Sequence, residues 1–199
     1  MMQWPDRGGW PAAVPELTTP RLRLRALQAD DATALLEVLG DQRVTHYHSM
    51  QTLVSLAEAR NALARVAERF QAGEMIRWAI QPRTERRLIG TIGLLHLVAE
   101  HRRGELGYEL AHRWWGQGLM PEAAAAVVDY GFTVLGLHRI EAGVLVGNQP
   151  SVRVLDKLGF REEGTLRHYL YLKGRFQDVR WFGLLHPDAI PTSQQQSKL

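Results

Sequence analysis

The chain has 199 residues, of which 45% are hydrophobic and 23% charged, as in an ordinary water-soluble globular protein. This composition excludes a disordered, coiled-coil or collagen-like chain, and no apolar run reaches the roughly 18 residues of a membrane-spanning helix. The absence of cysteine excludes disulfides and a thiol nucleophile, and it favours a cytoplasmic protein. A net charge of +3 suits an anionic ligand but is too small to indicate a nucleic-acid-binding surface.

Length and composition predict one domain with a sizeable core. Residues 1–16 mix Trp, Pro and Gly without periodicity and are expected to form an N-terminal arm. The domain is expected to span residues 17–187, and the polar residues 188–199 are expected to form a flexible C-terminal tail. No signal peptide is apparent, because the N-terminal residues lack a basic segment followed by an apolar one.

The first half of the chain carries both strand and helix patterns. Strict alternation in RLRLR (residues 21–25) predicts a strand with Leu22 and Leu24 facing inward. Apolar residues spaced as on one face of a helix predict helices at residues 32–39 and about 54–71. Three strands are expected next, at residues 76–80, 88–97 and 104–110.

The second half of the chain also carries both helix and strand patterns. A helix is expected at about residues 120–135 and a strand at 139–146. A short helix at about 150–158 has Pro at its first turn and Gly159 past its end. Two strands, near 163–171 and 178–185, complete the order. Because helices interleave with strands and several strands are linked as hairpins, this order predicts a mixed α/β sheet.

The loop between residues 110 and 121 has the features of an anion site. Gly116-Gln117-Gly118 follows a predicted strand and precedes a helix with Pro121 near its start. Glycines let the backbone approach a ligand closely, and the free amides of a helix start attract an anion such as a pyrophosphate. The dinucleotide pattern GxGxxG is not met and no P-loop follows. An ordinary tight turn is the alternative interpretation.

A second strand–loop–helix unit, GNQPSVRVLDKLGF, follows about 30 residues later. Asn148 and Ser151 lie three residues apart at its helix start, where either side chain could simply cap the helix. Two such units in tandem, one with an anion-binding loop and one with polar groups at its mouth, favour an extended ligand with phosphate and amide groups. That ligand would lie between two splayed strands.

The segments WWGQGLMPEA, RIEA, NQPSVRVLDKLGF and GRFQDVRWFGLL resemble the GNAT superfamily of acyl-CoA N-acyltransferases. They most resemble its RimJ/RimL-like branch, the ribosomal-protein N-terminal acetyltransferases, and TTPRLRLRALQADDATAL is similar to that branch's first strand and helix. The resemblance implies a single-domain, mostly antiparallel sheet of about seven strands, flanked by about four helices, with splayed fourth and fifth strands. It implies acetyl-CoA as cosubstrate in the gap between those strands, and no metal.

The resemblance also implies which residues bind CoA. Residues 113–118 match the family motif Q/R-x-x-G-x-G/A, whose backbone amides hold the pyrophosphate. The strand end at Leu110 is implied to pair with the pantetheine arm and to orient the thioester carbonyl. Asn148 matches an asparagine that contacts pantetheine, and Ser151 matches a serine near the thiol of the leaving CoA. The complete implied set is Leu110, Arg113, Trp115, Gly116, Gln117, Gly118, Leu119, Asn148 and Ser151.

The implied reaction is direct attack of a primary amine on the acetyl thioester in a ternary complex. A tyrosine that serves many family members as general acid is replaced here by Leu155, so Ser151 becomes the candidate hydrogen-bond donor to the departing thiolate. Glu105 is the first candidate for the base that deprotonates the amine, Glu141 the second and Glu109 the third. A solvated carboxylate, or a water chain without a dedicated base, is the alternative.

The histidines of THYHS have a spacing that would suit metal chelation on a strand. His46 and His48 lack a third ligand, however, and no metal is expected. The segment is expected instead to line the acceptor pocket. Tyr47, Trp78 and His96 are further candidates for that pocket, with core packing as the alternative.

The sequence therefore predicts an acetyl-CoA-dependent N-acetyltransferase. The acceptor is expected to be a primary amine, either the N-terminus of a protein such as a ribosomal protein or a small molecule such as a polyamine or antibiotic. The missing tyrosine leaves open a second hypothesis, a non-catalytic acyl-CoA sensor. A basic isoelectric point near 9.5 is the sole argument for an RNA-associated role. No membrane partner is expected, and a homodimer is left open.

Overall fold

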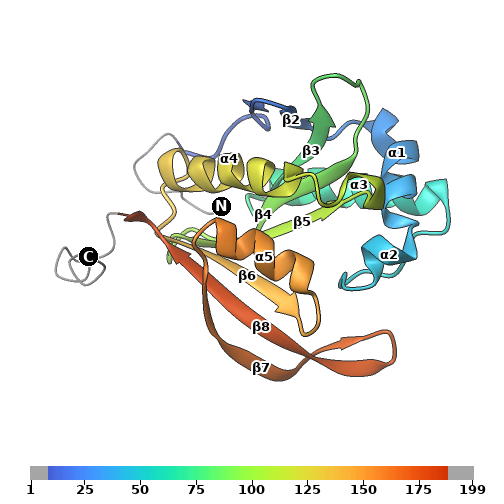
Figure 1. Ribbon diagram of the computed structural model, residues 1–199. Coiled ribbons are helices and arrows are strands. Elements are labelled where there is room, and N and C mark those ends of the chain that lie inside the picture. The colour runs from blue at the N-terminus through green and yellow to red at the C-terminus, as the bar shows by residue number, and fades with distance from the viewer. Residues whose placement is uncertain (1–8, 188–199) are drawn as a thin grey trace.

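The computed structural model describes residues 9–187, which form a single eight-stranded sheet with helices packed on it (Figure 1). The expected tail at 188–199 and the first eight residues of the expected arm lie outside this range. The strand order is β1-β2-β3-β4-β5-β6-β8-β7, and every neighbouring pair is antiparallel except β5 and β6. The predicted mixed, mostly antiparallel α/β fold is confirmed.

The elements follow the predicted order closely. The strands are β1 (Leu17–Thr18), β2 (Leu22–Ala26), β3 (Ile76–Pro82), β4 (Gly90–Val98), β5 (Arg103–Leu110), β6 (Arg139–Leu145), β7 (Arg161–Leu172) and β8 (Arg175–Leu185). The α-helices are α1 (Ala32–Leu39), α2 (Gln42–Thr45), α3 (Leu56–Gln71), α4 (Leu119–Thr133) and α5 (Gln149–Lys157). Single 3-10 turns lie at Ala29–Asp31 and His112–Trp114.

Helices cover both faces of the sheet, as adjacent residues of β3 show. Trp78 packs in the main core with apolar residues of α4 and α5, whereas Ala79, on the opposite face, packs with residues of α1. Leu22 and Leu24 are fully buried in the main core, which confirms the inward face predicted for the first strand. The central strands are therefore covered on both faces, whereas the edge strand β7 is mostly exposed.

Two elements differ from the sequence prediction because they are too short to produce a periodic pattern. Strand β1 has two residues and helix α2 has four. The helix expected from residue 54 begins at Leu56, because Ser55 caps it: its hydroxyl accepts a hydrogen bond from the amide of Glu58 at 3.2 Å. Within residues 9–187, no helix combines the length and the apolar character that crossing a membrane requires.

Strands β5 and β6 separate after a short paired segment. Their parallel pairing covers only residues 103–105 against 139–141, and beyond Glu105 and Glu141 no register partner joins them. These are the fourth and fifth of the strands expected from the sequence, and their predicted splay is confirmed. The gap places the C-terminal half of β5 opposite the loop that leads into α5 (Figure 1).

Candidate active site

The gap beyond Glu105 exposes main-chain groups of β5. The amide of Ala111 donates to the carbonyl of Ile89 in the neighbouring chain segment at 2.8 Å. Because hydrogen-bonding directions alternate along an antiparallel strand, the main-chain groups of Tyr108 and Leu110 point the other way, into the gap. The Leu110 carbonyl accepts a hydrogen bond from the Trp115 indole at 2.7 Å, so its amide is the group left for a ligand.

The loop before α4 forms a cradle of unpaired amides. Gly116 and Gly118 have φ of +74° and +72°, a left-handed conformation that favours glycine, and Gly118 is the N-cap of α4. No acceptor within residues 9–187 takes a hydrogen bond from the amides of residues 116–120. These five amides, together with the positive end of α4, fit the charge and acceptor groups of a pyrophosphate.

Side chains on the outer side of the loop hold this cradle in place. The Arg21 guanidinium donates to the Gln117 carbonyl at 2.9 Å and forms an ion pair with Glu122 at 2.6 Å. The Gln117 side chain donates to the Arg113 carbonyl at 3.0 Å. Of the predicted CoA-binding residues, Arg113 and Gln117 are not among those that line the cleft described below, although the Gln117 main-chain amide belongs to the cradle.

The start of α5 faces the same gap. The Asn148 side-chain oxygen accepts a hydrogen bond from the Ser151 amide at 3.3 Å, so this oxygen caps the helix, as the alternative interpretation expected. Within the described chain, the Asn148 side-chain NH2 has no acceptor, which leaves it for a ligand amide. Leu155, at the position where many family members carry tyrosine, is fully buried in the core.

A tyrosine from β5 lies against Ser151 instead. The Tyr108 hydroxyl is 2.7 Å from Ser151 Oγ and 3.3 Å from the Ser151 carbonyl oxygen. Burial raises the Tyr108 pKa to about 12, despite the opposing hydrogen bond with Ser151, so the phenol stays protonated at neutral pH. Sequence reasoning missed Tyr108. The available signal was the alternation in GELGYEL, which places a hydroxyl at the mouth of the gap.

Two cavities meet at this point. A cleft of about 360 Å³ runs from the cradle to the start of α5, and a larger cavity of about 760 Å³ lies between β4, β5, β6, α3 and the β7–β8 hairpin. Both cavities are lined by the same six residues at their junction: Tyr47, His48, Tyr108, Glu109, Asn148 and Ser151. A group bound in the cleft and a group bound in the larger cavity can therefore meet there.

Glu109 is locked in a buried ion-pair cluster. It contacts the Arg77 guanidinium and the Thr91 hydroxyl, and the His48 Nε2 lies 3.5 Å from its Oε2. Burial alone would raise the Glu109 pKa, but Arg77, followed by His48 and Thr91, outweighs it and lowers the pKa to about 2. The Met50 amide donates to His48 Nδ1 at 3.0 Å, which directs Nε2 toward Glu109. A carboxylate this acidic is a poor base.

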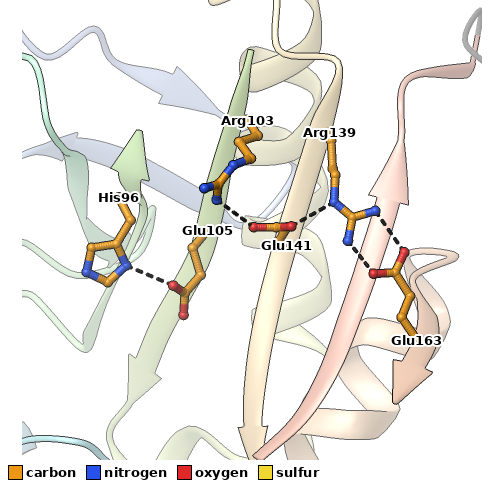
Figure 2. Close-up of polar contacts among 6 residues, drawn as sticks. All are labelled: His96, Arg103, Glu105, Arg139, Glu141 and Glu163. Atoms are coloured by element: carbon orange, nitrogen blue, oxygen red, sulfur yellow. Dashed lines mark hydrogen bonds and ion pairs between the residues drawn. The ribbon is translucent and has the colours of Figure 1, made fainter. Parts of the chain in front are cut away.

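Glu141 is held between two arginines, as Figure 2 shows. Arg103 approaches one of its oxygens at 3.0 Å and Arg139 the other at 2.8 Å, while Arg139 also pairs with Glu163 on β7. The hydrogen bonds to Glu163 and Glu141 raise the Arg139 pKa against the effect of burial, so this guanidinium remains charged. Glu141 is therefore a structural ion-pair partner in a network that ties β5, β6 and β7 together.

Glu105 has a different partner. Its Oε2 lies 2.8 Å from His96 Nδ1, and no guanidinium of the described residues forms a hydrogen bond or ion pair with it (Figure 2). Glu105, Glu109 and Glu141 all line the larger cavity, and Glu105 and Glu109 share one face of β5 as the alternation predicts. Of the three carboxylates, Glu105 is thus the one without an arginine partner among the described residues.

The acceptor-pocket candidates separate into two groups. Tyr47 and His96 line the larger cavity, whereas Trp78 is fully buried in the core, where its indole donates to the Pro15 carbonyl at 2.6 Å. The THYHS segment is not a strand, on which the spacing of His46 and His48 would suit chelation, because α2 ends at Thr45 and a turn follows. In residues 9–187, no group of three or more metal-ligating side chains comes together.

Comparison with known proteins shows the family to which the chain belongs. Residues 21–161 match the acetyltransferase (GNAT) domain family. The chain is 39% identical over 173 residues to the uncharacterized N-acetyltransferase YoaA of Bacillus subtilis, covering 87% of this chain and 98% of that protein. It is 27% identical over 194 residues to the [ribosomal protein uS5]-alanine N-acetyltransferase of Escherichia coli, covering 92% and 98%.

Solved structures agree in fold. Mycobacterium smegmatis RimJ, solved in complex with a CoA-disulfide, matches with a TM-score of 0.80 and 27% identity over 98% of this chain and 95% of that one. Spermidine N-acetyltransferase from Vibrio cholerae, solved with CoA and spermine, matches with a TM-score of 0.74 and 26% identity over 84% and 96%. These relatives carry two acceptor classes on one scaffold, so the fold by itself does not choose between them.

Proposed function

We propose, since the chain belongs to the GNAT acetyltransferase family, that this acetyl-CoA-dependent N-acetyltransferase acts on the α-amine at the N-terminus of a protein. Acetyl-CoA is the cosubstrate, and family membership favours catalysis over the alternative of a non-catalytic sensor. The observation that carries the proposal is the junction of the two cavities, at which an amine and a thioester can be brought together.

The smaller cleft is assigned to acetyl-CoA. Its pyrophosphate would accept hydrogen bonds from the amides of residues 116–120, and Lys157 and Arg153 on the same wall would attract the remaining phosphate charge. The pantetheine arm would run along the β5 edge, where the Leu110 amide and the Asn148 NH2 offer donors. This path leads the thioester to Tyr108 and Ser151.

The reaction at the junction requires three catalytic roles: a hydrogen-bond donor to the leaving thiolate, a donor to the oxyanion, and a base for the amine. The Tyr108 phenol, protonated at neutral pH, donates a hydrogen bond to the sulfur as the thiolate departs, and Ser151 orients that phenol. The Tyr108 main-chain amide, which points into the gap two residues before the Leu110 amide, would stabilise the negative charge that develops on the carbonyl oxygen. Glu105 accepts the proton of the attacking amine, because Glu109 and Glu141 are neutralised by arginines.

Charge balance in the larger cavity supports a singly charged acceptor. Four arginines line it (Arg65, Arg69, Arg77 and Arg103), against three glutamates (Glu105, Glu109 and Glu141). A polyamine carries several positive charges and would meet too few unpaired carboxylates. A protein N-terminus brings one ammonium followed by peptide carbonyls, which are acceptors for arginine side chains.

A thiol-release assay with acetyl-CoA tests the proposal. Short peptides with free N-termini, the same peptides with blocked N-termini, spermidine and an amino sugar form the acceptor panel. Release of CoA with free-N-terminal peptides, and a much lower rate with spermidine, is the expected result. A higher kcat/KM for spermidine or the amino sugar than for every free peptide would replace the protein acceptor with a small-molecule one.

A further inference from the structure

His96 occupies an unusual position on β4. The register between β4 and β5 shifts between Leu95 and Val98, which marks a bulge, and His96 within it has a φ of +46°. This left-handed conformation is unfavourable for a residue other than glycine, and bulges next to active sites commonly re-aim a side chain. Here the bulge brings the imidazole over β5, where Nδ1 lies 2.8 Å from Glu105 Oε2 (Figure 2).

The contact links the acceptor cavity to bulk water. Glu105 and His96 both line the larger cavity, but the Glu105 side chain is 25% exposed and the His96 side chain is 62% exposed. Glu141 is paired with arginines, which cannot take up a proton. The histidine next to Glu109, His48, is only 20% exposed, and its Nδ1 is occupied by the Met50 amide. Of the three carboxylates on the cavity wall, Glu105 alone has an exposed, titratable side chain bonded to it.

We propose that His96 is a positioning and proton-relay residue, which fixes Glu105 at the acceptor amine and carries the amine proton from Glu105 to solvent. This inference rests on the proposed function. The acceptor ammonium gives its proton to Glu105, and the protonated Oε2 then donates it to Nδ1 of the imidazole tautomer that carries hydrogen on Nε2. The resulting imidazolium releases the Nε2 proton to water, and the exposed ring then exchanges its remaining proton from Nδ1 to Nε2 through water, which restores the starting tautomer. One proton thus leaves the site for each amine that becomes a nucleophile.

The charged groups around His96 set the pH range in which its imidazole can accept a proton. Glu105 on β5 is its direct partner, and two arginines also face it, Arg69 on α3 and Arg103 on β5. The hydrogen bond to Glu105 outweighs burial and the two arginines, so the His96 pKa is raised above its ordinary value of 6.5. At a pH below that raised value the imidazole is already protonated and cannot accept the proton from Glu105.

Two substitutions separate the relay from a purely structural role. His96→Asn keeps a hydrogen-bond donor near Glu105 and tolerates the left-handed backbone, but it cannot titrate. His96→Gly relieves the backbone strain and leaves space that free imidazole can fill from solvent. His101→Asn is the matched control, because His101 is exposed on the same β4–β5 connection and does not line the cavity.

The readouts are kcat and KM for the best acceptor, measured between about pH 6 and 9, the range in which histidine titrates. We expect His96→Asn to lower kcat about tenfold with little change in acceptor KM, and to remove the histidine-dependent part of the pH profile. We expect imidazole to restore His96→Gly in proportion to its unprotonated fraction, and His101→Asn to match the wild type. Wild-type kcat in His96→Asn, or no restoration of His96→Gly by imidazole, would overturn the relay.

The controls also separate this inference from the proposed function. If the wild-type protein binds acetyl-CoA but releases no CoA with any amine, the proposed function fails before His96 is tested. If the wild type turns over and the His96 variants behave as it does, the relay fails and the proposed function stands.

Discussion

The Tyr108 hydroxyl lies 2.7 Å from Ser151 Oγ, and this contact joins β5 to the start of α5 at the wall shared by the two cavities. Tyr108, on the part of β5 that no longer pairs with β6, thus contacts the helix α5 on the other side of the gap. A hydroxyl pair at this junction supplies a hydrogen-bond donor where Leu155 offers none.

Removing the phenol should slow the chemical step. Tyr108→Phe deletes one oxygen from a largely buried side chain, and we expect kcat to fall by about 10- to 100-fold with the acetyl-CoA dissociation constant nearly unchanged. Steady-state kinetics and calorimetric titration with acetyl-CoA measure the two quantities. Equal losses in kcat and in acetyl-CoA affinity would assign Tyr108 to binding instead.

Ser151 should act through the same contact. We expect Ser151→Ala to lower turnover more than cosubstrate affinity, and the double variant with Tyr108→Phe to be little worse than the more damaged single variant. Such non-additivity is what a shared hydrogen bond produces. Effects that multiply in the double variant would show that the two hydroxyls work independently.

The cradle before α4 predicts a charge-sensitive binding step. Gly118→Asp places a carboxylate beside the assigned pyrophosphate, and aspartate tolerates positive φ better than most residues, so we expect acetyl-CoA affinity to fall at least tenfold. The charge of an acidic residue at a helix N-terminus is favourable for the fold and offsets part of the strain of the positive φ. Gly136→Asp, at a φ of +66° beyond the other end of α4, is the matched control and should bind normally.

The buried cluster around Glu109 predicts a pH-dependent stability. Because the folded pKa is about 2, below the ordinary 4.5, the ion pair stabilises the fold above about pH 4.5 and this contribution is lost as the pH falls toward 2. Glu109→Gln leaves Arg77 without its charged partner, and we expect it to lower the free energy of unfolding by on the order of 3 kcal/mol at pH 7.

Urea denaturation at pH 7 and at pH 3 checks this expectation. The difference in free energy of unfolding between wild type and Glu109→Gln should be smaller at pH 3 than at pH 7. The control Glu100→Gln, at an exposed position, should match the wild type at both pH values. A gap that widens on acidification would contradict the assignment of Glu109 as a charged structural partner.

The β7–β8 turn is tied to α2 by one side chain. Lys173 Nζ donates to the carbonyl of Thr45 at 2.6 Å and to that of His46 at 3.2 Å, next to two residues of the cavity junction. Lys173→Asn suits the local φ of +51° but removes these bonds, and we expect acceptor KM to rise about threefold to tenfold with acetyl-CoA affinity retained. Arg175→Asn on the same hairpin is the control, and an unchanged KM in Lys173→Asn would rule out a role in closing the cavity.

The fold could be predicted from sequence wherever patterns were local and long enough. The alternation in RLRLR and the segments with helical periodicity predicted elements within a few residues of those observed. The glycine spacing correctly predicted the loop before α4. Helix α2 is one turn long, too short for a periodic pattern, so the sequence did not predict it. Its conformation depends on contacts with α1 and with Lys173, which lies 127 residues from His46 in sequence.

The site was predicted less completely, because its side chains are paired across distant strands. The three glutamates were all identified, but nothing in the sequence distinguishes Glu109, beside Arg77 on β3, from Glu105, beside His96 on the bulge of β4. Tyr108 was overlooked because the expected acid lay on α5, and only the splay of β5 and β6 brings a β5 hydroxyl to Ser151.

A crystal structure of the CoA complex tests the central assignment most directly. The account predicts pyrophosphate oxygens within hydrogen-bond distance of the amides of residues 116–120 and the CoA sulfur next to the Tyr108 hydroxyl. CoA bound outside this cleft, or a sulfur remote from the junction of the two cavities, would contradict it.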